Sequence, residues 1–125
     1  MKITKRSIRY FTLFKLPLVY FSGIRISEIN EDRVEASVRL RWINQNPFRS
    51  LFWAVQGMAA ELTTGALLIR EIEEQKKPVS MLVIGTKASF SKKAKGRIRF
   101  SCEQTKDAKD LVQKAISSGD GQLHW

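Results

Sequence analysis

The chain of 125 residues has only one cysteine, Cys102, and one histidine, His124. A single cysteine excludes an internal disulfide, so nothing in the sequence indicates an oxidising compartment, and we expect a cytoplasmic protein. A single histidine excludes, within one chain, both a histidine-dependent catalytic triad and a zinc cluster of histidine and cysteine ligands. We therefore expect no metal site and no resident cofactor, and hydrolysis would have to use carboxylates.

Long apolar runs are also scarce. The first 22 residues carry five cations and no acid, but their apolar residues alternate with the charges, so we expect no secretory leader. The longest weakly charged stretch, residues 51–69, contains Glu61, whose carboxylate would be costly in lipid. These features predict a buried helix within a soluble protein of one domain, residues 1–125.

Two segments carry the net charge of +10. Residues 1–22 contribute +5 and residues 79–102 contribute +6. The cations of the second segment are Lys87, Lys92, Lys93, Lys95, Arg97 and Arg99. This density favours a partner that bears phosphates, such as a nucleotide, a nucleic acid or an anionic lipid, although a solvated strand end and turn would look the same. Aromatic residues do not alternate with these cations, so nucleic acid is the less favoured partner.

Hydrophobic periodicity predicts the order of the first elements. Residues 4–16 are expected to form a loosely amphipathic helix, which could pack against the domain or lie on an anionic membrane. Strands are expected within residues 23–43, because residues 34–42 alternate strictly between apolar and polar side chains. Asparagines and a proline at residues 44–47 then predict a turn.

A long central helix is expected over residues 50–77, with Ser50 as its N-cap. Residues 51–69 are apolar on nearly every side of this helix, which predicts that its first five turns are buried. Residues 70–77 are almost all charged, so the last two turns should protrude into solvent.

Strands are expected within residues 79–103, where Cys102 would be a small core residue. An exposed amphipathic helix is predicted over residues 106–117. A further strand starts at residues 121–125 as the sequence ends, which we interpret as a truncation or as an unusually short variant.

A sheet wrapped around a long apolar helix resembles the α+β hotdog fold of acyl-CoA thioesterases and dehydratases. The residues that carry the resemblance are Trp42 and the stretch from Asn44 to Gly65, including its segment Ala-Glu-Leu-Thr-Thr-Gly. This stretch is similar to the thioesterase-like branch that is described only as a domain of unknown function. The likeness covers about residues 5–125, without the closing strands that the family normally has.

The resemblance implies particular site residues. In hotdog thioesterases of the phenylacetate-pathway type, a loop asparagine precedes a His-Gly-Gly at the helix start, and an acid follows that histidine by nine positions. Asn46 and Glu61 match the asparagine and the acid, whereas Phe52, Trp53 and Ala54 occupy the His-Gly-Gly positions. Bulky rings there would crowd the approach of a thioester to the backbone, so the resemblance supports the fold more strongly than the activity.

Glu61 is the candidate general base or nucleophile. A carboxylate within an apolar helix is costly unless it is hydrogen-bonded or lines a cavity, and desolvation would make it a better proton acceptor. Gly57, Thr64 and Gly65 share its helical stripe and would leave a groove beside it. Alternatively, Glu61 pairs with a strand arginine, and the glycines only allow close packing of the sheet.

In the catalytic interpretation, Glu61 activates a water or attacks a thioester carbonyl, while free backbone N–H groups near residues 51–53 hold the oxyanion. Asn46 and Gln56 would orient the water or the carbonyl, although Asn46 is also a typical turn residue. Coenzyme A enters only as part of the substrate, with its phosphates held by the basic segment. The expected substrate contacts are Phe52, Trp53, Gly57, Thr64, Gly65, Lys92, Lys93, Lys95 and Arg97.

The sequence leaves three functions open. One is a thioesterase that acts on an acyl-CoA or acyl-carrier thioester, and another is a non-catalytic acyl- or lipid-binding module. The last is a basic surface protein that docks on an anionic membrane or nucleic acid through residues 2–15 and 87–99. Hotdog domains resemble one another in pairing edge strands across a two-fold axis, and the uncharged run at residues 79–84 would suit such an edge. We therefore expect a homodimer or a tetramer.

Overall fold

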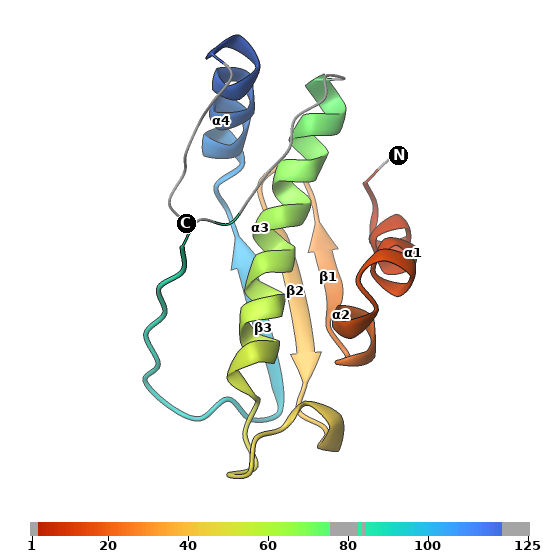
Figure 1. Cartoon of the computed structure of the whole chain (residues 1–125), viewed down its shortest axis with the longest axis vertical. Helices are drawn as coiled ribbons and strands as arrows, with labels where there is room; N and C mark the ends of the chain where they lie inside the picture. The colour runs from red at the N-terminus through yellow and green to blue at the C-terminus, as the bar shows by residue number, and fades with distance from the viewer. Residues whose placement is uncertain (1–2, 76–82, 84, 119–125) are drawn as a thin grey trace.

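A computed structural model describes residues 3–75, 83 and 85–118. Within them, two short helices precede a hairpin, a long helix follows, and a third strand and a last helix complete the order (Figure 1). The elements are α1 (Lys5–Lys15), α2 (Pro17–Phe21), β1 (Arg25–Ile29), β2 (Val34–Arg39), the 3-10 turn η1 (Trp42–Asn44), α3 (Trp53–Gln75), β3 (Arg97–Cys102) and α4 (Thr105–Ser118). None of the helices in these described ranges is long and apolar enough to cross a membrane.

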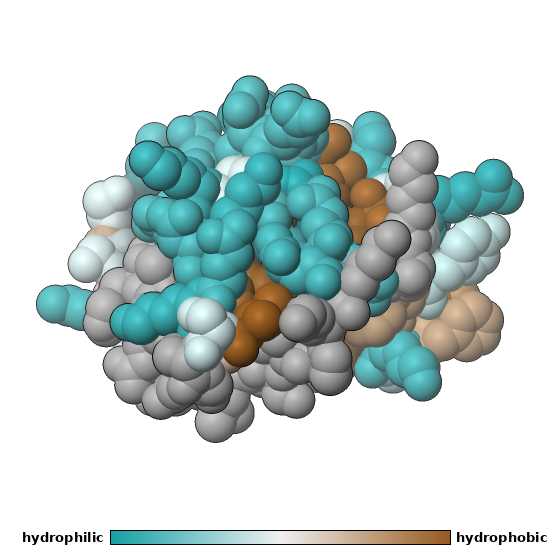
Figure 2. Space-filling model, turned by 90° about the horizontal axis from the view of Figure 1, so that it is seen from above, coloured by the Kyte–Doolittle hydropathy of each residue, from teal (hydrophilic) through white to brown (hydrophobic). Residues whose placement is uncertain are grey.

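The sheet is antiparallel and has the strand order β1-β2-β3. Val34 of β2 pairs with Cys102, and Arg39 at the other end of β2 pairs with Arg97. Helix α3 lies across one face of this sheet and contacts both β2 and β3 (Figure 1). The pairs α1–α2 and α3–α4 are in contact, and α1 also contacts β1. Seen from above, hydrophilic side chains cover much of the surface (Figure 2).

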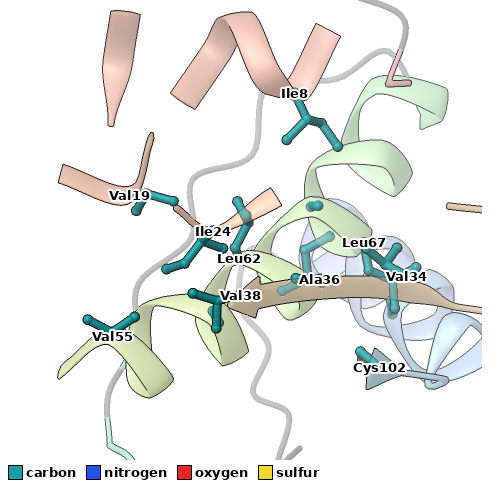
Figure 3. Close-up of a cluster of buried hydrophobic side chains, with 14 of the residues drawn as sticks. Ile8, Val19, Ile24, Val34, Ala36, Val38, Val55, Leu62, Leu67 and Cys102 are labelled. Carbon is teal, nitrogen blue, oxygen red and sulfur yellow. The ribbon is translucent and has the colours of Figure 1, made fainter. Parts of the chain in front are cut away.

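The core lies between α3 and the sheet (Figure 3). Alternate residues of β2, Val34, Ala36 and Val38, are buried beneath α3, as the strict alternation of the sequence predicts. Figure 3 shows Val55 and Leu62 of α3 on the same side as these strand residues. Cys102 is 6% exposed, which confirms its expected place in the core.

The expected boundaries agree with the structure at two elements and differ at two others. The expected helix over residues 4–16 corresponds to α1, which ends before Pro17, and the short helix α2 that Pro17 starts was not expected. Trp42 is not the end of the strand but lies in η1, with 85% of its surface exposed. Ser50 is not the N-cap, since α3 begins at Trp53. Residues 106–117 do form a helix, α4.

The strand expected between residues 79 and 90 is not formed at residues 83 and 85–90, which are irregular. A strand needs a hydrogen-bonded neighbour, and in the described part of the sheet β3 pairs with β2, while none pairs with this segment. The rest of this expected strand, residues 79–82 and 84, lies outside the described residues, as does the expected strand start at 121–125.

Candidate functional site

The loop that leads into α3 is fixed by the buried side chain of Asn44, which is 1% exposed. Its Nδ2 donates to the carbonyl oxygens of Ser22, at 2.9 Å, and Arg39, at 3.0 Å. Its Oδ1 accepts a hydrogen bond of 2.8 Å from the N–H of Arg41, and its own carbonyl accepts one of 2.9 Å from the N–H of Phe52. Asn44 therefore ties α2, the end of β2 and the start of α3 together. Its sequence context predicts only a turn residue.

Asn46, the expected loop asparagine, uses its amide within its own turn. Its Nδ2 donates to Ser50 Oγ at 2.8 Å, and its Oδ1 accepts from the N–H groups of Phe48, at 2.8 Å, and Ser50, at 3.3 Å. Arg49, inside this turn, has a left-handed backbone with φ of 60°. Both ends of the amide are thus engaged, which is the arrangement that a turn residue requires.

The start of α3 presents two backbone N–H groups that have no acceptor in the described part of the structure. The N–H of Leu51 donates to the carbonyl of Ala94 at 2.8 Å, and the N–H of Phe52 is held by Asn44. By contrast, the N–H groups of Trp53 and Ala54 have no hydrogen-bond acceptor among residues 3–75, 83 and 85–118. The first N–H groups of a helix carry partial positive charge and suit a developing oxyanion.

Gln56 lies one turn into α3 and does not face a free site. Its Nε2 donates to the carbonyl of Leu51 at 3.0 Å, so the side chain folds back on the helix start. The amide therefore supports the backbone that presents the two free N–H groups.

Exposed aromatic rings lie at the start of α3, next to Gly57. Phe52 and Trp53 are 50% and 49% exposed, and the Trp53 ring meets Phe90 edge to face with 5.2 Å between centroids. A Cβ on Gly57 would lie 4.0 Å from the Trp53 ring, so this ring lies next to Gly57. The bulky side chains at the helix start thus line an open surface instead of filling the interior.

Glu61 is exposed, which corrects the expectation that it is buried. It lies on the outward stripe that contains Trp53 and Gly57, and its carboxylate has no ion pair or hydrogen bond within the described ranges, so pairing with Arg39 or Arg41 is also wrong there. The reason is that the sheet covers only one side of the first half of α3, and Glu61 lies on the other side. An exposed carboxylate keeps its charge at low cost.

Two further expected groove residues behave differently. Thr64 donates its hydroxyl to the carbonyls of Glu61, at 3.1 Å, and Ala60, at 3.4 Å, so it is satisfied by its own helix. Gly65 is buried and does not line the outward surface. Of the residues expected to line a groove beside Glu61, Gly57 therefore shares the outward stripe of α3 with Trp53 and Glu61, whereas Gly65 does not.

The basic segment lies against the start of α3. Lys92, Lys93 and Lys95 are exposed in the loop before β3, and Arg97 is the first residue of that strand. Because the carbonyl of Ala94 holds the N–H of Leu51, the lysines on both sides of Ala94 are brought to the helix start. The ammonium group of Lys93 also lies 5.9 Å from the centroid of the Phe48 ring.

Glu71 is the buried carboxylate that the sequence analysis missed. It is 1% exposed in a part of α3 that was expected to protrude, and its Oε2 has no hydrogen-bond partner in the described structure. Burial raises the pKa of Glu71, and the neighbouring Glu74 raises it further, against the opposite effect of Lys109. Glu71 lies four residues after Leu67 and therefore on the same face of the helix, which could have predicted its burial.

No group of three or more His, Cys, Asp or Glu side chains in the described ranges is placed to hold a metal ion.

Comparisons with known proteins identify the relatives of this chain. Residues 4–121 match the family described as "Domain of unknown function (DUF4442)". A protein of unknown function from Chlorobaculum tepidum TLS has a similar structure, with a TM-score of 0.82 and 17% identity over 95% of this chain and 74% of that one. A Pseudomonas aeruginosa protein described as a probable thioesterase is also similar, with a TM-score of 0.74 and 22% sequence identity. This match covers 97% of this chain and 80% of that one. A search of curated proteins found no match. These likenesses confirm the expected thioesterase-like hotdog fold.

Proposed function

The chain belongs to the DUF4442 family, and on that premise we propose that it hydrolyses an acyl thioester carried by coenzyme A or by an acyl carrier. The observation that carries the proposal is the pair of free N–H groups at Trp53 and Ala54. Residues 92–95, which we call the lysine loop, lie beside them because the N–H of Leu51 donates a hydrogen bond to the carbonyl of Ala94. Donors for an oxyanion and cations for phosphates therefore adjoin each other within a thioesterase-like fold.

Distance along α3 indicates that the reacting groups come from two chains. Glu61 is eight residues after Trp53, which is about 12 Å along a helix axis. One carbonyl cannot contact both, because a base or nucleophile must lie about 3 Å from its target. Two copies with antiparallel α3 helices across a two-fold axis would bring Glu61 of one chain to the helix start of the other. We therefore propose a homodimer with two composite sites.

In this proposal Glu61 removes a proton from a water as that water attacks the thioester carbonyl. The oxyanion is held by the N–H groups of Trp53 and Ala54. Collapse of the tetrahedral intermediate breaks the carbon–sulfur bond, and the thiolate takes the proton from Glu61. The products are a carboxylic acid and a free thiol, and Glu61 is again a carboxylate.

The phosphates of coenzyme A would be held by Lys92, Lys93 and Lys95. Replacing all three with glutamine should raise the KM for an acyl-CoA by about tenfold at low ionic strength, and the effect should shrink as salt is added, because exposed charges are screened. The matched control is the N-acetylcysteamine thioester of the same acyl group, which lacks the phosphates. An equal rise in KM for both substrates would contradict this assignment.

The first experiment is the hydrolysis of short, medium-length and aryl acyl-CoA substrates by the protein and by Glu61→Gln. We expect turnover that is lost in Glu61→Gln and retained in Glu31→Gln, which makes the same change in the exposed turn between β1 and β2. Unchanged turnover in Glu61→Gln would refute its role as the base.

Subunit mixing tests the composite site. Trp53→Pro removes the backbone N–H at residue 53, and helices tolerate proline at their first position. Trp53→Ala is its control, because it removes the ring but keeps the N–H. If Glu61→Gln and Trp53→Pro are each inactive, an equal mixture that exchanges subunits should recover about a quarter of the activity, because half the dimers contain one intact site. No recovery despite exchange would place both groups in one chain.

A non-catalytic acyl-binding module is the second candidate. It is favoured by Phe52 and Trp53, which stand where the related thioesterases have His-Gly and present half-exposed rings at the helix start. Binding of acyl-CoA with no turnover for any acyl group, and with equal affinity in Glu61→Gln, would establish it in place of the enzyme.

A further inference from the structure

Helices α1 and α2 carry a large exposed apolar surface. Its members, which we refer to as the helical-pair surface, are Tyr10, Phe14, Leu16, Leu18 and Phe21, with exposed fractions between 41% and 75%. On α1, Tyr10 and Phe14 lie one turn apart on the side opposite to buried Ile8 and Thr12. Five exposed apolar side chains on two short helices that contact each other favour an apolar partner for this part of the molecule.

The same two helices are strongly basic. In the described residues before Glu28, the charged side chains are all cations, and all are exposed: Lys5, Arg6, Arg9, Lys15 and Arg25. Rings and aliphatic side chains next to lysines and arginines are typical of helices that lie in the interface of an anionic bilayer. Figure 2 shows brown and teal side chains next to each other at the edge of the molecule on the side of α1 and α2.

A pocket of about 360 Å³ lies between α1, α2, β1 and α3, on the side of α1 opposite to Tyr10 and Phe14. Its buried wall includes Ile8, Ile24 and Leu62, and its exposed lining includes Arg6, Arg9 and Arg25, with no acid among its lining residues. Cations around an apolar hollow suit an anionic ligand, but this hollow is separate from the helical-pair surface.

We propose that α1 and α2 dock the protein on the surface of a membrane that contains anionic lipids. The charge and the apolar side chains of this surface distinguish a membrane from the two other possible partners, a second copy of the chain and a nucleic acid. A second copy packed through the same surface about a two-fold axis would oppose like charges, because the helical pair has no acid to pair with its cations. A nucleic acid would pair with the cations but would leave Leu18 and the other aliphatic side chains in water. A bilayer accommodates both the charges and the apolar side chains.

Co-sedimentation with vesicles tests this proposal, separately from any thioesterase activity. The probes are vesicles of phosphatidylcholine alone and vesicles with phosphatidylglycerol at about three parts in ten. We expect binding to the anionic vesicles, much weaker binding to the neutral ones, and a loss of binding as NaCl is raised. Arg6→Gln with Arg9→Gln should weaken binding by about fivefold for each charge removed.

Two control pairs separate this surface from general effects. Arg39→Gln with Lys106→Gln removes two exposed charges outside the helical pair, and it should leave binding nearly unchanged. Phe14→Ser with Leu18→Ser should abolish binding, whereas Trp42→Ser with Ile43→Ser, also exposed apolar residues, should not. All eight side chains are exposed, so the variants should fold.

Three results would overturn the proposal. Equal binding to neutral and anionic vesicles would remove the role of the cations. Retained binding in Phe14→Ser with Leu18→Ser would remove the role of the apolar side chains. If the protein binds neither kind of vesicle, and Phe14→Ser with Leu18→Ser instead converts an oligomer to a monomer in light scattering, the surface contacts a second copy.

Discussion

Replacing Asn44 with alanine should destabilise the protein by about 3 kcal/mol. The change removes three side-chain hydrogen bonds, to Ser22, Arg39 and Arg41, from a site that is 1% exposed. Each buried hydrogen bond contributes about 1 kcal/mol to stability, and the unpaired groups that remain cannot reach water easily. In urea unfolding, with an m value of about 1.5 kcal/mol/M, the midpoint should fall by about 2 M.

Asn46→Ala is the matched control, because it removes the same side chain and also three hydrogen bonds. Asn46 lies in a partly exposed turn where water can replace the lost contacts, so its variant should lose about 1 kcal/mol or less. Asn44→Asp should be at least as harmful as Asn44→Ala, because it turns the donor toward two carbonyl oxygens into an acceptor. Equal midpoint shifts in Asn44→Ala and Asn46→Ala would refute the reasoning that burial sets the difference.

Three further predictions follow from burial and packing. Because the pKa of Glu71 is raised above its unfolded value, its ionisation opposes folding as pH rises, so Glu71→Gln should raise the free energy of unfolding, measured by urea denaturation, by on the order of 1 kcal/mol at pH 7 and by less at pH 4. Gly57→Ala should raise the melting temperature, since glycine costs about 1 kcal/mol within a helix and the new Cβ meets Trp53 at an ordinary contact distance; a lower melting temperature would contradict this. Burial raises the pKa of the Cys102 thiol, so a thiol reagent should label it only on unfolding, and rapid labelling of the native protein would refute its burial.

The elements that local pattern could identify were predicted well. The alternation along β2 placed Val34, Ala36 and Val38 in the core, and the 3.6-residue period placed α4. These succeed because burial on one face imposes a period on the sequence. The end of the first helix before Pro17 was also predicted, because proline cannot continue a helix from the preceding residues.

The site was predicted less well, because exposure depends on what covers each element. Glu61 and Glu71 both belong to α3, yet the acid within the apolar run is exposed, and the acid within the charged run is buried. The sequence shows the period of the helix but not which parts of its circumference the sheet and α4 cover. Charge drew attention to the lysine loop, but its contact with the helix start depends on one backbone hydrogen bond between Leu51 and Ala94, which composition cannot reveal.

The pairing of β2 with β3 has a consequence for how the protein folds. Val34 and Cys102 are neighbours in the sheet, but the whole of α3 lies between them in the sequence. Closing so long a stretch of chain loses much conformational entropy before any ladder bond forms, whereas the β1–β2 hairpin and the α1–α2 pair need only local contacts. We expect β3 to arrive last in refolding. The protection of the Cys102 thiol, measured by pulsed labelling during refolding, would therefore time the completion of the sheet.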